Sequence, residues 1–166
     1  TTEIDQMEVY AQNFVDALLA DHHNYLVVYP NNDLGSRLIL KAYEALNGNP
    51  RFRVIPSLRF EYFLTLLKNS QFIIGNSSAG IREAPYYGIP IINIGTRQQN
   101  RAVHADILHV DYQKAAIGAA LDMIDFHKVN VGDSDFGQGN SAQLFLDCLQ
   151  MTNFWQMNQQ KQFRDL

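Results

Sequence analysis

Residues 75–85, GNSSAGIREAP, carry the strongest local signal in the chain. A short apolar run at residues 71–74 leads into them, and a second apolar run follows at residues 89–94. This order predicts a strand, a tight turn of small residues, a helix and a second strand. Such a turn directs backbone N–H groups and the positive end of a helix dipole towards an anion.

The side chains of this turn suit a nucleotide diphosphate. Ser77 and Ser78 offer hydroxyl donors, while Ala79 and Gly80 allow a ligand to approach the backbone closely. Glu83 lies about one helical turn further on, within reach of a sugar hydroxyl beside the anion. Two alternatives stay open: a serine-rich turn of this kind is also an ordinary helix N-cap, and Glu83 also suits the helix dipole.

Short apolar runs alternate with helical patterns along the rest of the chain. Helices are predicted over residues 4–18, 37–46, 58–67, 113–126, 141–149 and 152–166, and strands over residues 25–29, 52–55, 71–74, 90–94 and 107–110. This alternation predicts an α/β fold, a Rossmann-like parallel sheet with helices on both faces. Ligands in such folds bind at the carboxyl ends of the strands. We therefore expect the polar loops at residues 30–36, 76–80 and 95–101 to gather along one edge.

Those loops and a neighbouring helix supply further candidates for a UDP-type ligand. Arg97 and Arg101 can clamp an anion from two directions, although one of them can instead pair with an acid on the rim. Asn32 is the side-chain donor that we include from the first loop. Tyr62 and Phe63 lie on a helix near the same edge and are candidates to pack on a base, although aromatic residues at helical spacing are more often core.

Length and composition set limits on function. With 166 residues, the chain predicts a single domain over residues 1–166. A net charge of -4 argues against nucleic-acid or acidic-membrane partners. Cys148 is the only cysteine, which excludes an internal disulfide and fits the cytoplasm. No apolar run approaches the roughly 20 residues of a membrane span. The chain begins without Met or a signal peptide, and we expect it to be a piece of a longer protein.

Metal and hydrolase chemistry find no support in the sequence. None of the five histidines has metal-ligand spacing with a second histidine and an acid. His22 and His23 are interpreted as a solvated turn. No Gly-x-Ser-x-Gly elbow or Gly-Lys-Ser/Thr phosphate loop is present. We predict no metal and no cofactor.

Two motifs together resemble the UDP-N-acetylglucosamine 2-epimerase family. They are residues 75–83, GNSSAGIRE, and residues 90–98, PIINIGTRQ, and they are most similar to the hydrolysing branch that feeds sialic and related nonulosonic acid synthesis. Residues 29–36 and 137–141 also resemble loops of that family, so the likeness runs from near residue 1 to about residue 149.

The resemblance implies the C-terminal half of a glycosyltransferase-B type fold, with UDP or a UDP-sugar as the partner. It implies that Ser77, Ser78 and the amides after them hold the diphosphate and that Glu83 binds the ribose. Phe63 or Tyr62 would then lie by the uracil. The family's chemistry is anti elimination of UDP across C1–C2, followed by addition of water to give N-acetylmannosamine.

One departure from the family pattern concerns catalysis. The family's His-Pro-x-Thr segment would precede residue 1, and its proton-moving acids would lie in an N-terminal domain. We therefore leave the catalytic residues unassigned and expect this chain alone to bind nucleotide weakly without turnover. Two other functions stay open: a glycosyltransferase-B C-terminal domain, and a non-catalytic nucleotide-sugar-binding domain.

A missing first strand has a structural consequence. In the sheet order 3-2-1-4-5-6 that strand would be central, between the strands at residues 25–29 and 71–74. A gap would expose backbone groups that need partners. We therefore expect the two flanking strands to pair directly, or to receive a strand from a second copy. We also expect a homo-oligomer.

Overall fold

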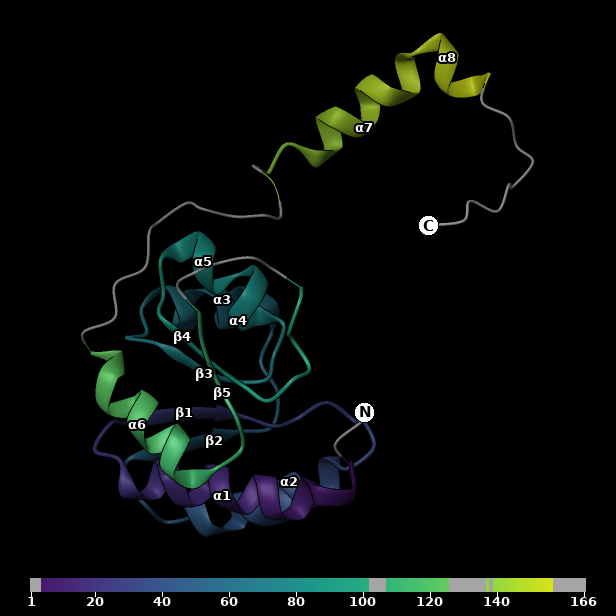
Figure 1. Ribbon diagram of the computed structural model, residues 1–166. Helices are drawn as coiled ribbons and strands as arrows, with labels where there is room; N and C mark the ends of the chain where they lie inside the picture. Colours follow the sequence, from purple (N-terminus) through teal and green to yellow (C-terminus); the bar gives the residue numbers. More distant parts are fainter. Residues whose placement is uncertain (1–3, 102–106, 126–136, 138, 157–166) are drawn as a thin grey trace. The chain divides into compact units, whose positions relative to one another are not determined.

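The computed structural model describes residues 4–101, 107–125, 137 and 139–156 (Figure 1). The chain divides into two compact units, Thr1–Asp133 and Ser134–Leu166. Every described strand belongs to the first unit, which therefore carries the Rossmann-like architecture. Among the described residues, no helix is both long enough and apolar enough to cross a bilayer.

The first unit alternates helices and strands in the predicted order. Its elements are η1 (Ile4–Gln6), α1 (Met7–Ala20), β1 (Tyr25–Val28), α2 (Ser36–Tyr43), η2 (Glu44–Leu46), β2 (Phe52–Ile55), α3 (Phe60–Lys68), β3 (Ile73–Gly75), α4 (Ala79–Arg82), α5 (Ala84–Tyr87), β4 (Ile91–Ile94), β5 (Ile107–Val110) and α6 (Lys114–Ile124). The second unit contains α7 (Ser141–Gln150) and α8 (Thr152–Trp155). The predicted terminal helix is confirmed only at residues 152–155, because the rest lies outside the described residues.

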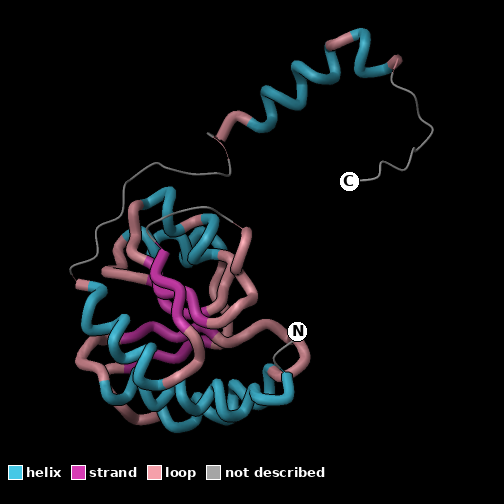
Figure 2. Tube along the Cα trace, viewed as in Figure 1, coloured by secondary structure: helices cyan, strands magenta, loops and turns pink. Residues whose placement is uncertain are grey.

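All described strand pairs are parallel, but they form two sheets (Figure 2). β1 pairs with β2, with Tyr25 opposite Phe52, and the second sheet has the order β3-β4-β5. The predicted direct pairing of residues 25–29 with 71–74 is therefore wrong. A shared core keeps the sheets apart, because α1 packs on α6 while α6 packs on β4 and β5.

Helices cover two faces, as predicted. On one face, α1, α2 and α6 share a core with both sheets that includes Val15, Leu18, Ile92 and Ile117. On the other face, α3, α4 and α5 pack around Ile91, whose side chain points away from that of Ile92 because strand residues alternate. Figure 1 shows α1 and α2 beside β1 and β2, and α3 to α5 grouped with the other sheet.

The helix expected after the serine turn is interrupted. It consists of two four-residue helices, α4 and α5, with Glu83 between them. Pro85 has no backbone N–H and cannot bond to the carbonyl four residues earlier, so the first helix ends before it. Gly88, with φ +66°, then ends α5 in the left-handed conformation that glycine favours.

Candidate functional site

A cavity of about 480 Å³ lies where β1 and β3 end. Three polar loops contribute to it, one after each of β1, β3 and β4. Their lining residues are Pro30, Asn31, Asp33, Asn76, Ser77, Ser78, Thr96 and Arg97. The expectation that these three loops gather along one edge is thereby confirmed, because parallel strands bring their carboxyl ends together.

The cavity brings together four of the ten predicted ligand-binding residues. Phe63, Ser77, Ser78 and Arg97 line it. Six others lie among the described residues but outside its lining: Asn32, Tyr62, Ala79, Gly80, Glu83 and Arg101. Glu83 is half-buried between α4 and α5, and Tyr62 is exposed on α3. Their role in binding UDP stays a prediction.

The serine turn is partly engaged with its own backbone. The Ala79 N–H donates to Ser77 Oγ at 3.3 Å, and the Arg82 N–H donates to the Ser78 carbonyl at 2.9 Å. This is the N-cap interpretation realised for Ser77. Both serine side chains nevertheless remain exposed at the cavity, where their hydroxyls can still donate to an anion.

Gly80 has a packing role that the sequence did not reveal. It is buried, and a Cβ atom there would lie 3.2 Å from Ile91 Cγ2 on β4. The missing side chain therefore lets α4 approach the sheet, which holds the turn against β3 and β4.

The two arginines of the third loop have different partners. The Arg97 guanidinium forms an ion pair with Asp33 at 3.6 Å, which joins the loops after β1 and β4. This confirms the alternative in which one arginine pairs with a rim acid. Arg101 donates to Gln98 Oε1 at 3.4 Å. The described contacts thus leave Arg97 at the cavity, in an exposed pair that a ligand anion can compete for.

Gln98 is a positioning residue that sequence reasoning missed. Its side chain is buried, and Nε2 donates to the Asn76 carbonyl at 2.8 Å. This bond ties the arginine loop to the start of the serine turn. Gln98 belongs to the PIINIGTRQ motif, so the signal was present, but a glutamine in a polar loop gives no sign of burial.

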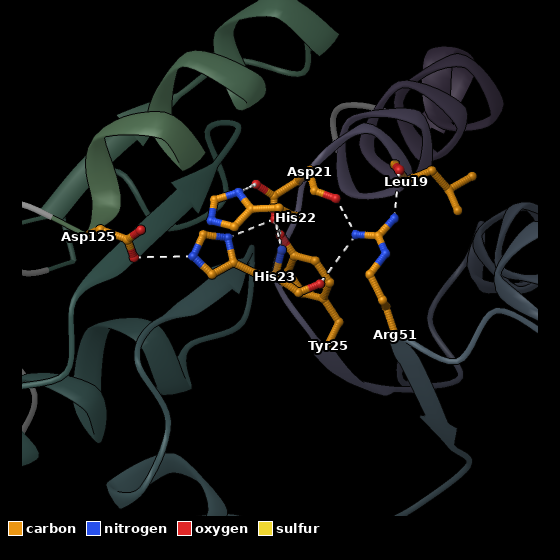
Figure 3. A network of polar contacts seen from close by, with 7 residues as sticks. All are labelled: Leu19, Asp21, His22, His23, Tyr25, Arg51 and Asp125. Atoms are coloured by element: carbon orange, nitrogen blue, oxygen red, sulfur yellow. Dashed lines mark hydrogen bonds and ion pairs between the residues drawn. The ribbon is translucent and has the colours of Figure 1, made fainter.

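A second polar network lies at the opposite end of β1 (Figure 3). His23 is only 8% exposed, so its interpretation as part of a solvated turn is wrong, whereas His22 is exposed. The His23 ring contacts Asp21 Oδ2 at 2.8 Å and Asp125 Oδ1 at 3.1 Å, which links the end of α1 to the end of α6. The Tyr25 hydroxyl donates to the same Asp21 oxygen.

This network includes a possible metal-ligand group. Asp21, His22 and His23 place one ligand atom each within 4.8 Å of one another. However, Asp21 Oδ2 already accepts hydrogen bonds from the His23 backbone, the His23 ring and the Tyr25 hydroxyl. These bonds account for the arrangement without an ion.

The two carboxylates around His23 predict a pH dependence of stability. Burial disfavours the charged ring, but hydrogen bonds to Asp21 and Asp125 outweigh it and raise the pKa of His23 above 6.5. Burial likewise disfavours the charged form of Asp21, yet hydrogen bonds from Tyr25 and His23 lower the pKa of Asp21 to about 2. His22, stacked on His23 at 4.1 Å, is the other titratable ring nearby.

The sign follows from these directions. The stabilising contribution of charged His23 is fully present below its ordinary pKa and is lost as pH rises through the raised pKa. The Asp21 contribution is lost as pH falls through about 2. The melting temperature, relative to that of a His23→Gln variant, should therefore increase between about pH 8 and about pH 5. A pH-independent difference in calorimetric scans would contradict this, and His22→Gln is the exposed control.

Comparison with known proteins places this architecture in a family. The sequence model described as UDP-N-acetylglucosamine 2-epimerase matches residues 1–150. A UDP-N-acetylglucosamine 2-epimerase of Neisseria meningitidis serogroup B is 40% identical over 169 residues, which cover 100% of this chain and 45% of that protein. A hydrolysing UDP-N,N'-diacetylbacillosamine 2-epimerase of Legionella pneumophila is 29% identical, over 85% of this chain and 37% of that protein.

The fold also matches a solved structure. The Methanocaldococcus jannaschii UDP-GlcNAc 2-epimerase, in complex with UDP-GlcNAc and UDP, superposes with a TM-score of 0.69 at 22% identity. The match covers 89% of this chain and 42% of that chain, so the present chain spans less than half the length of these relatives. With the family sequence model matched over residues 1–150, the chain belongs to the UDP-N-acetylglucosamine 2-epimerase family.

Proposed function

We propose that this chain is the UDP-binding part of a hydrolysing UDP-N-acetylglucosamine 2-epimerase, a nucleotide-binding domain of a larger enzyme. The observation that carries the proposal is the cavity in which Ser77, Ser78 and Arg97 meet Phe63 at the carboxyl ends of the strands. Hydroxyl donors, a guanidinium and an aromatic ring are the groups that a pyrimidine nucleoside diphosphate requires.

Each side chain then has a defined role. The hydroxyls of Ser77 and Ser78 donate to the diphosphate, and Arg97 exchanges Asp33 for a phosphate oxygen. Phe63 packs on the uracil, with Tyr62 on the same helix. Glu83 accepts from the ribose hydroxyls.

Three further predicted groups complete the site, and two lie along the serine turn. The backbone amides of Ala79 and Gly80 lie within it and face the nucleotide. Asn32 and Arg101 contribute from the loops after β1 and β4.

In the proposed reaction this domain stabilises UDP as the leaving group. Elimination breaks the C1–O bond, and negative charge develops on the departing phosphate oxygen. Fixed donors such as Ser77, Ser78 and Arg97 stabilise that charge without transferring a proton themselves. The base that removes the C2 proton is assigned to polypeptide outside residues 1–166. We place the assembled enzyme in the cytoplasm, as a homo-oligomer.

Calorimetric titration with UDP, GDP and CMP tests the proposal. UDP is expected to bind more tightly than the other two, and Glu83→Ala should weaken UDP binding about tenfold or more through the loss of hydrogen bonds to a charged acceptor. Glu44→Ala is the matched control, because Glu44 is exposed on η2 and lies outside the cavity lining. Equal affinities for the three nucleotides, or an unchanged UDP affinity in Glu83→Ala, would contradict the assignment.

A further inference from the structure

The edges of β1 and β3 that face each other carry unpaired backbone groups. The N–H groups of Tyr25 and Tyr29 donate to β2 residues, at the Arg51 and Ile55 carbonyls. Because strand residues alternate in direction, Leu26 and Val28 direct their N–H and C=O groups away from β2. On β3 the Ile73 N–H donates to the Pro90 carbonyl beside β4, so Ile74 points the other way.

The cavity continues between these two edges. Its apolar lining includes Leu26 and Val28 from β1 together with Ile73 and Ile74 from β3. Phe14 of α1 and Phe63 of α3 also line it. Leu26 is 43% exposed, although it lies at the centre of the order β2-β1 and β3-β4-β5. The space is therefore an apolar slot with strand edges on two sides.

The two edges run in the same direction. Tyr25, at the start of β1, contacts Phe72, just before β3, with ring centroids 6.1 Å apart. The residues after each strand, Pro30 and Asn76, line the same cavity. A strand inserted between them would thus be parallel to both, as every described strand pair already is.

We propose that this slot binds one additional parallel β-strand, supplied by polypeptide outside residues 1–166 and joined to the N-terminal end of α1. The strand would have about four residues, apolar on both faces, because a parallel strand between helical layers is buried on both sides. Its backbone would pair with Leu26 and Val28 on one side and with Ile74 on the other.

The position of α1 supports this source. Met7, the first residue of α1, lines the cavity, and Ile4 and Met7 lie against Gly35 in the loop after β1. α1 therefore begins at the edge where a parallel strand in the slot would end, which gives a short strand–α1–β1 crossover. The relatives are more than twice as long as this chain, so they contain polypeptide that could provide such a strand.

Amide hydrogen exchange tests the slot directly. In the 166-residue chain, the amides of Leu26, Val28 and Ile74 should exchange about tenfold or more faster than that of Val27, which points towards β2. An extension that places Val-Ile-Val-Val before Thr1 should slow the three slot amides by about 100-fold, while the protein stays monomeric by sedimentation. The matched control extension, Val-Pro-Val-Pro, should give no protection because its prolines cannot donate.

Several results would overturn the proposal. Slot amides as protected as that of Val27 in the monomeric, unextended chain would mean that the edges are already closed. Protection that rises with protein concentration would identify a second copy as the occupant. If the extended chain fails to fold, the Val-Ile-Val-Val peptide added in trans at millimolar concentration provides the same readout, and no protection there contradicts the slot. Nucleotide affinity plays no part in this readout, so it is independent of the proposed function.

Discussion

Gly95→Ala is expected to destabilise the protein by roughly 2–5 kcal/mol, through a positive φ combined with overpacking. Gly95 has φ +74°, and a Cβ atom there would lie 2.5 Å from Tyr112 Cζ. Tyr112 cannot move aside easily, because its ring stacks on Tyr10 with centroids 4.1 Å apart and its carbonyl accepts from Asn13 at 3.1 Å. Urea unfolding followed by circular dichroism measures the change.

Gly48→Ala separates the two causes. Gly48 also has a positive φ, +78°, but nothing lies within 4 Å of the position that a Cβ atom would take. This control should lose only about 1 kcal/mol, the cost of the left-handed conformation for alanine. Equal losses in both variants would show that the contact with Tyr112 is not the cause. Gly95 directly precedes Thr96 and Arg97, so a partly folded Gly95→Ala protein should also bind UDP poorly.

Arg51→Ala is expected to cost about 2–4 kcal/mol, because three carbonyl groups lose a charged donor at a helix C-terminus. The Arg51 guanidinium donates to the Leu19 carbonyl at 2.8 Å, to the Asp21 carbonyl, and to the His23 carbonyl at 3.4 Å (Figure 3). It thereby binds the end of α1 to the start of β2 and offsets the helix dipole beside the Asp21 carboxylate.

Two substitutions serve as controls in the same unfolding experiment. Arg51→Lys keeps the charge but lacks the planar fork, so it should recover less than half of the loss. Arg53→Ala, at an exposed position two residues further along β2, should change stability by no more than about 0.5 kcal/mol. Full recovery by lysine would mean that charge alone, rather than the geometry of the guanidinium, secures the end of the helix.

The sequence predicted the parallel α/β architecture because its signals are local. Short apolar runs such as residues 91–94, buried throughout, have the length and composition of buried strands. The gathering of the polar loops also followed, since parallel strands end at one edge. Within that edge the sequence also anticipated one specific contact, the pairing of a loop arginine with a rim acid, now found between Arg97 and Asp33.

The remaining features depend on contacts between distant parts of the chain. The separation of β1 from β3 is set by a core that α1 and α6 share with both sheets, which no local pattern encodes. His23 is buried because Asp125, about 100 residues later, lies beside it, and Gln98 is buried because its partner is the Asn76 carbonyl. A polar residue in a loop carries no local sign of such a partner.

The contact between Asp33 and Arg97 also determines what happens when an anion arrives. The guanidinium is already neutralised by a neighbour from a different loop, so a ligand phosphate substitutes for a carboxylate and does not meet a bare cation. Such a substitution gains less from long-range attraction than binding to an uncompensated charge and depends less on added salt. The displaced carboxylate must then return to solvent, so filling the site releases the loop after β1 from the loop after β4.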